Sequence, residues 1–172
     1  MTTDREQGRV RVELHVRSLA PRAGGRQQDR VIDRLDHLES VGRVDEVAID
    51  VWGRQVGLSS AAARTDAGRY VLDRVESFRE WAAETGRSIE SFFETRRVES
   101  EITDEKYVAL VLPSLSLAEY RDGDLAYVAP CSDGGEVTTV PDRLDVLSAS
   151  DSTLSGATEG TTQPVPTEIE EE

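Results

Sequence analysis

A loop rich in arginine and glycine carries the residue types best suited to binding an anion. Four arginines in the segment 17–30 surround the adjacent glycines Gly24 and Gly25, directly before a stretch with helical spacing. The N–H groups and the dipole at the start of a helix attract anions, and guanidinium groups bind carboxylate or phosphate through paired hydrogen bonds. We therefore expect an anion or partner site formed by Arg17, Arg22, Gly24, Gly25, Arg26 and Arg30. The alternative is an exposed loop that is simply solvated.

His15 and Trp52 are a second candidate site, as an aromatic and cationic surface for a partner. His15 lies on the polar side of an alternating segment, and Trp52 lies on the side opposite Val51. If the rest of the chain leaves that side uncovered, the two residues form an exposed patch suited to a protein or a nucleic acid. The alternative is that Trp52 packs in the core, because large aromatic side chains are mostly buried.

The sequence contains no pattern typical of an enzyme or a metal centre. His15 and His37 are too few and too far apart to indicate a metal site, and the nucleotide-binding fingerprints GxxxxGK[ST] and GxGxxG are absent. The single cysteine, Cys131, excludes an internal disulfide and a multi-cysteine metal site, and we interpret it as a small, partly buried thiol. We therefore expect no catalytic residue, no metal and no cofactor.

The composition indicates adaptation to salt. Acidic residues outnumber basic ones 34 to 20, the net charge is −14, and Lys106 is the only lysine. This composition is typical of a cytosolic protein of a halophilic archaeon, where molar salt screens the repulsion between like charges. We expect a cytoplasmic location, because the chain shows neither a signal peptide nor an apolar run long enough to span a membrane.

The charge is distributed unevenly along the chain. Residues 142–172 contain eight acids and one arginine, whereas residues 1–30 contain seven arginines and four acids. The last part is rich in Ser, Thr, Gly, Pro and Glu and has too few apolar groups to offset its chain entropy. We predict a flexible N-terminus over 1–8, a single domain over 9–148 and a disordered acidic tail over 149–172.

The first 52 residues predict a βαβ unit. Residues 10–17 alternate strictly, which predicts a strand whose apolar side faces the core and whose polar side faces water. Residues 28–41 have the apolar spacing of a helix that ends near Gly42, and residues 47–51 alternate again. A helix between two strands suits a right-handed crossover that makes the strands parallel.

The remaining residues predict a second long helix, an antiparallel strand group and a short closing helix. Thr65 is the expected N-cap of the long helix and Gly86 its end, while Pro141 opens the closing helix. Pro113 should mark a strand start, bulge or edge, and residues 121–124 should form a hairpin turn. These elements predict a two-layer α+β domain. The alternative is a thioredoxin-like topology without redox cysteines, because a proline here precedes a hairpin and a final helix.

Several segments also resemble a known family: RVELHVRSLAP, RVIDRLDHLESVGRVDE, VWGRQVGLSS, ARTDAGR, FREWA, FFETRRV and LAEYRDGDLAYVAPCSDG. Over residues 9–147 the chain is similar to small haloarchaeal proteins described as helix-turn-helix domain proteins. The resemblance implies a DNA-binding transcriptional regulator and brings no catalytic residues. The predicted order of elements differs from that motif, because a helix-turn-helix needs two helices joined by a short turn.

We expect a non-enzymatic regulatory or protein-interaction module of a halophilic archaeal cytosol, with a protein partner or a second copy of the chain. One alternative is a DNA-binding transcriptional regulator that uses the cationic N-terminal region. Another is the binding of a small anionic ligand at the loop around Gly24 and Gly25. Duplex binding would weaken steeply with salt, which separates it from the interaction module. Binding of a small anionic ligand would require a formed pocket at Gly24 and Gly25.

Overall fold

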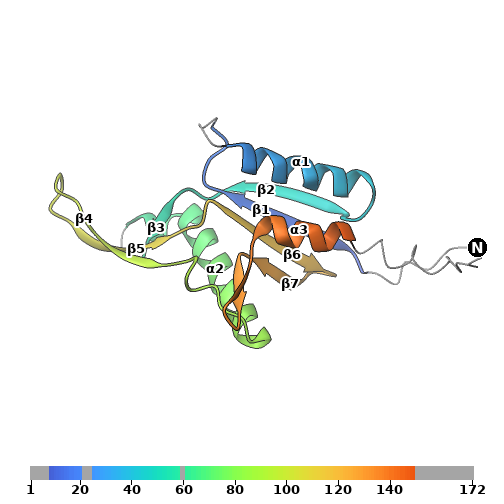
Figure 1. The fold of residues 1–172 in the computed structure, drawn as a ribbon. Coiled ribbons are helices and arrows are strands. Elements are labelled where there is room, and N and C mark those ends of the chain that lie inside the picture. The colour runs from blue at the N-terminus through green and yellow to red at the C-terminus, as the bar shows by residue number, and fades with distance from the viewer. Residues whose placement is uncertain (1–7, 21–24, 59–60, 150–172) are drawn as a thin grey trace, which may run out of the picture.

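The computed structural model describes residues 8–20, 25–58 and 61–149 (Figure 1). The predicted flexible N-terminus and acidic tail fall almost entirely outside these residues and stay predictions. Within the described residues, no helix is both long enough and apolar enough to cross a membrane.

A four-stranded sheet with the order β2-β1-β6-β7 forms the centre of the fold. β1 (Val10–Val16) is parallel to β2 (Glu46–Val51), and α1 (Arg26–Ser40) connects them, which confirms the βαβ unit. β1 also pairs antiparallel with β6 (Leu115–Arg121), which pairs with β7 (Asp124–Ala129). The predicted hairpin turn lies between β6 and β7, where Asp122 and Gly123 have φ angles of 52° and 91°. Two successive residues with positive φ match the twist of paired strands.

Helices cover both faces of this sheet. α1 and α3 (Val140–Ala149) pack on one face, where the buried cluster includes Leu14, Leu35 and Leu144. α2 (Asp66–Thr85) packs on the other face, with Val75 and Phe78. The α+β class and the short closing helix are confirmed, but the sheet lies between two helical layers rather than under one. The thioredoxin-like topology stays an alternative prediction.

The prediction of a water-facing side for β1 is wrong. Glu13 and His15 both have 0% exposure, because α2 lies over the side of the strand that was expected to be wet. Alternation of polar and apolar residues predicts two chemically different faces, but it does not state whether the polar face meets water or a helix. Both faces of the central strand are therefore inside the protein.

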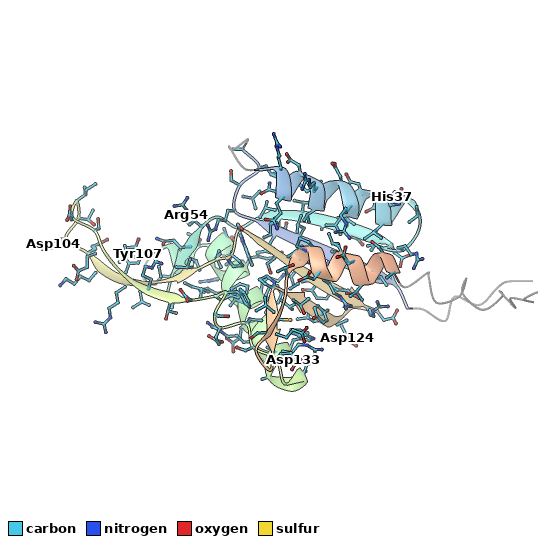
Figure 2. All side chains as sticks on the ribbon, viewed as in Figure 1. His37, Arg54, Asp104, Tyr107, Asp124 and Asp133 are labelled. Atoms are coloured by element: carbon cyan, nitrogen blue, oxygen red, sulfur yellow. The ribbon has the colours of Figure 1, made fainter. Side chains whose placement is uncertain are left out.

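The predicted antiparallel group is divided between two main sheets. β5 (Lys106–Val111) pairs with β3 (Gln55–Gly57) and β4 (Thr95–Glu99), while the residues after Pro113 enter the central sheet as β6. The hairpin of β4 and β5 projects from the body of the molecule, and Figure 2 shows Tyr107 and Asp104 along it. A short pair, β8 (Cys131–Asp133) and β9 (Glu136–Thr138), follows β7, and the Cys131 thiol is buried there.

The ends of α2 are set by local sequence, as predicted. The Thr65 hydroxyl accepts a hydrogen bond from the Gly68 N–H at 3.0 Å, and Gly86 ends the helix with a φ of 70°. A side-chain cap satisfies an N–H group that has no partner within the helix, and glycine adopts the left-handed conformation without steric cost. A 3₁₀ turn, η1 (Ala61–Arg64), precedes the cap.

A buried ion pair and apolar side chains hold α3 on the sheet. Arg143 donates from Nε and Nη2 to Oε2 of the fully buried Glu119 at 2.9 and 2.7 Å. Arg121 donates to Oε1 of the same carboxylate at 3.0 and 2.7 Å. The Arg143 guanidinium also lies over the Tyr127 ring, 3.9 Å from its centroid. Glu119 is thus compensated by two arginines, one of which comes from the closing helix.

We expect Leu144→Ala to lower the free energy of unfolding by about 2–5 kcal/mol, because Leu144 is completely buried and its truncation leaves a cavity. The matched control is Val146→Ala on the same helix, where the side chain is 50% exposed and the change should be within about 0.5 kcal/mol. Urea unfolding followed by circular dichroism measures both variants. Equal effects of the two substitutions would contradict the placement of α3.

Candidate functional site

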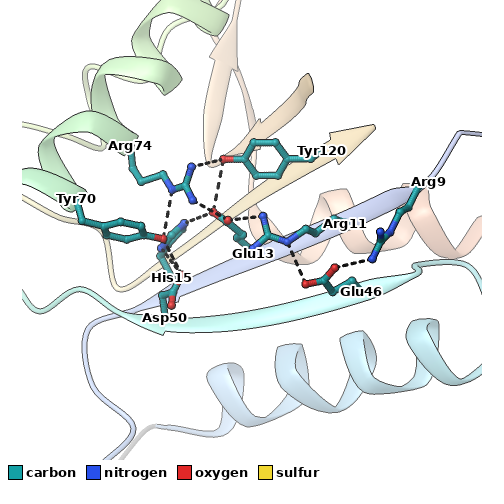
Figure 3. A network of polar contacts seen from close by, with 9 residues as sticks. All are labelled: Arg9, Arg11, Glu13, His15, Glu46, Asp50, Tyr70, Arg74 and Tyr120. Carbon is teal, nitrogen blue, oxygen red and sulfur yellow. Dashed lines mark hydrogen bonds and ion pairs between the residues drawn. The ribbon is translucent and has the colours of Figure 1, made fainter. Parts of the chain in front are cut away.

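A polar network lies beneath α2, with Glu13 of β1 at its centre (Figure 3). Its Oε1 accepts a hydrogen bond from Arg74 Nη2 at 2.9 Å and pairs with Arg11 Nη1 at 2.8 Å. Its Oε2 accepts a hydrogen bond from the Tyr120 hydroxyl at 3.5 Å. The partners come from β1, α2 and β6, so one buried carboxylate connects three elements.

His15 lies beside this carboxylate and is also fully buried. Its Nε2 is 3.4 Å from Glu13 Oε2 and its Nδ1 is 4.0 Å from Asp50 Oδ2, yet neither nitrogen makes a hydrogen bond within the described residues. The imidazole stacks on Trp52 with ring centroids 4.6 Å apart and an interplanar angle of 18°. An edge of the His15 ring therefore faces two carboxylates without being bound by either.

The register of the two parallel strands brings Asp50 to His15. In the β1–β2 ladder His15 is paired with Asp50, so their side chains lie on the same face of the sheet. The Tyr70 hydroxyl donates to Asp50 Oδ2 at 2.9 Å and accepts from Arg74 Nε at 3.2 Å. α2 thus supplies a partner to each of the two carboxylates beside His15.

Burial and neighbouring charges have opposite effects on the pKa of Glu13, whereas burial and the charge of Glu13 act in the same direction on the pKa of Tyr120. Burial would raise the pKa of Glu13, but the His15 imidazole and the guanidiniums of Arg74 and Arg11 outweigh it and lower that pKa. Burial, together with the negative charge of Glu13, raises the pKa of Tyr120 to about 12. Glu13 is therefore held as a carboxylate and Tyr120 as a neutral phenol that donates a hydrogen bond.

The predicted exposed patch of His15 and Trp52 is wrong, because both side chains are buried. Trp52 is 7% exposed, and its Nε1 donates to the Pro113 carbonyl at 3.4 Å. The alternative, in which Trp52 packs in the core, is the observed arrangement. His15 and Trp52 do lie together, but they face the interior beneath α2 rather than a partner.

The structure describes only part of the predicted loop that is rich in arginine and glycine. Arg17 donates from Nε and Nη2 to the Leu112 carbonyl at 3.0 and 2.5 Å, so it fixes the end of β1 to the segment before β6. Gly25 is the N-cap residue of α1, where no side chain caps the helix, and Arg26 and Arg30 are exposed in its first turns. Arg22 and Gly24 lie outside the described residues, so the loop as an anion site stays a prediction.

Exposed arginines occur in the first turns of α1 and α2 and in the segments that follow β2 and precede α2. Parallel strands end at the same edge of a sheet, and α1 and α2 both begin near this edge. We name this surface the arginine-rich end and define it by five exposed residues: Arg26, Arg30, Arg54, Arg64 and Arg69. None of the five forms an ion pair with another described residue.

Arg87, Arg96 and Arg97 also form no ion pair with a described residue, but most arginines elsewhere contrast with this set. Seven of them pair with carboxylates of the same chain: Arg9, Arg11, Arg34, Arg74, Arg79, Arg121 and Arg143. An ion pair neutralises the field of a guanidinium and occupies its donors. The arginine-rich end therefore retains charge and hydrogen-bond donors for an external partner.

Sequence reasoning missed most of the polar network. Tyr70 is 38% exposed and its hydroxyl donates a hydrogen bond to Asp50, a contact that no sequence pattern indicated. One signal was present: Tyr70 and Arg74 are four residues apart and therefore share a face of α2. Nothing in the local pattern placed that face over β1.

We expect Glu13→Gln to lower the free energy of unfolding by about 3 kcal/mol at pH 7, because it leaves Arg74 and Arg11 without their buried partner. Since folding lowers the pKa of Glu13, its stabilising effect is present above the ordinary value of 4.5 and is lost as the pH falls through the folded value. The difference between wild type and variant should therefore shrink below pH 4.5.

Denaturant unfolding from pH 7 to pH 3 measures this difference. The control is Glu46→Gln, which removes the half-exposed partner of Arg9 and Arg11 and should change stability by less than about 1 kcal/mol. A gap between wild type and Glu13→Gln that stays constant over the whole pH range would contradict the assignment.

Comparison with known proteins gives one match. A family model described as a helix-turn-helix domain matches residues 4–152, which is most of the chain. No curated protein and no solved structure gives a significant match. The chain belongs to the helix-turn-helix domain family.

Proposed function

We propose that this protein is a non-enzymatic regulator that binds duplex DNA through its arginine-rich end. The observation that carries the proposal is that five exposed arginines form no ion pair with a described residue, whereas seven other arginines pair with carboxylates. Guanidinium groups bind phosphate through paired hydrogen bonds, and contacts to phosphate supply most of the affinity for duplex DNA. Membership of a helix-turn-helix family favours DNA over the protein partner that the sequence suggested first.

The proposed contact does not use a recognition helix. Among the described residues, α1 and α2 are separated by β2, β3 and η1, so they are not joined by the short turn of a helix-turn-helix pair. α2 also contains five acids and three arginines, and Arg74 and Arg79 are already paired. A surface with that charge would bind phosphates weakly.

Two further features add positive potential to the arginine-rich end. The N-termini of α1 and α2 lie there, and the positive end of a helix dipole attracts phosphate. The β4–β5 hairpin projects from the same region, with Arg54 near its base (Figure 2) and the exposed Arg96 and Arg97 on β4. The acidic residues on other surfaces repel DNA less at moderate salt, because the Debye length is about 10 Å at 0.1 M.

We expect the double substitution Arg54→Ala and Arg64→Ala to weaken duplex binding and to reduce the slope of log affinity against log salt by about 2, since each arginine contacts about one phosphate. Fluorescence anisotropy with a labelled duplex between 50 and 200 mM KCl measures the affinity. Arg79→Ala is the control, because it removes a positive charge that is already paired with Glu90.

Two results would refute DNA binding. One is the lack of duplex retention by the full chain and by a chain ended after Ala149, which removes the acidic residues that follow. The other is an equal loss of affinity in the Arg79→Ala control. Retention of a protein partner that depends on Arg54 and Arg64 would instead support the interaction module.

We further propose that the protein works in the cytosol of a halophilic archaeon. The support is the net charge of −14 and the near replacement of lysine by arginine. We expect the midpoint of thermal unfolding to rise between 0.1 and 2 M KCl, because salt screens the repulsion between carboxylates. Differential scanning calorimetry measures the midpoint, and a midpoint that falls with KCl would contradict salt adaptation.

A further inference from the structure

We propose that Glu13, His15 and Asp50 form a binding site for one divalent transition-metal ion. One ligand atom from each residue lies within 4.8 Å of the other two (Figure 3). An ion with bonds of about 2.1 Å keeps its ligands within roughly 4.2 Å of one another, so the site needs only a small contraction to coordinate it. The site shares no residue with the arginine-rich end, so the inference is independent of DNA binding.

His15 supplies the observation that points to a cation. Its side chain is fully buried, and within the described residues neither ring nitrogen has a hydrogen-bond partner. Buried polar atoms are nearly always satisfied, so a pair of unsatisfied nitrogens indicates a missing partner. The groups facing the two nitrogens are the carboxylates of Glu13 and Asp50, which favour a cation. The ion would bind one nitrogen, and the other would carry the ring N–H and face a carboxylate.

The residues around the three ligands hold them in position. Glu13 keeps Oε1 on Arg74 and Arg11, which leaves Oε2 on the side of His15. The Tyr70 hydroxyl fixes Asp50, and stacking on Trp52 fixes the plane of the imidazole. Hydrogen bonds to ligating groups orient them and tune the affinity for the ion.

The ligand chemistry and the charge of the site select the kind of ion. One imidazole and two carboxylates suit Mn²⁺, Fe²⁺, Co²⁺ or Zn²⁺ better than Ca²⁺, which prefers oxygen ligands alone. Asp50 is 41% exposed on the edge strand β2, so an ion can enter from that side. Arg74 and Arg11 both bind Glu13 and oppose the charge of the ion, but their side chains are 29% and 37% exposed, so solvent screens part of that charge.

The test is titration of the full chain, after treatment with a chelator, with MnCl₂ or ZnCl₂ in an isothermal calorimeter. We expect one ion to bind per chain, and Asp50→Asn to weaken its binding at least tenfold. Glu46→Gln is the matched control, because Glu46 lies on the same strand and its side chain is 44% exposed, yet it is not one of the three ligands. Its affinity for the ion should equal that of the wild type.

Proton NMR of the wild-type chain gives a second measurement that does not depend on a variant. We expect substoichiometric Mn²⁺ to broaden the ring signals of His15 before those of His37, which lies on the exposed side of α1. The proposal is overturned if no ion binds, if Asp50→Asn and Glu46→Gln bind equally, or if His37 broadens first. It is also overturned if the His15 signals respond to pH alone, because a proton on the imidazole would then be the missing partner.

Discussion

The compensation of Glu13 is the interaction on which the rest of this structure depends. β1 is the central strand of the fold, and helices cover both of its faces, so a carboxylate on its polar side has no access to water. A buried charge is tolerated only when it is paired and hydrogen-bonded. Arg74 can meet that requirement only if α2 lies over the sheet at the observed height, so the ion pair fixes the position of the helix.

The opposite face of the sheet uses the same principle with different partners. Glu119 of β6 is buried beneath α3, and Arg121 and Arg143 occupy both of its oxygens. Apolar packing is not directional, whereas an arginine and a carboxylate bind in a defined geometry. Each helical layer thus has an apolar contact that supplies stability and an ionic contact that specifies its placement on the sheet.

The ion pairs of seven arginines distinguish them from the arginines of the arginine-rich end. In a chain with 34 acids, an exposed guanidinium has many carboxylates available to it. The arginine-rich end nevertheless has none within the described residues, and it lies where two helices begin. Beneath α2, by contrast, the buried His15 has no hydrogen-bond partner among the described residues and lies between two carboxylates.

The sequence by itself determined the elements whose signals are local. The Thr65 cap, the Gly86 terminus, the alternation in β1 and the turn at Asp122 and Gly123 each depend on neighbours within a few residues, and all were predictable. The excess of acid and the preference for arginine are likewise properties of composition. Two of the five residues of the arginine-rich end were visible in this way, since Arg26 and Arg30 belong to the predicted loop.

Only the tertiary structure decided which sides of these elements meet. His15 and Asp50 are 35 residues apart and meet through the register of two parallel strands, while Arg74 reaches Glu13 from a helix 61 residues further along the chain. Residues 106–121 look like one apolar run, but the fold divides them between two sheets at Pro113. The periodicity of a sequence predicts that one face of a strand is polar. Whether water, a helix or an ion contacts the polar groups of that face depends on long-range packing, which local spacing does not encode.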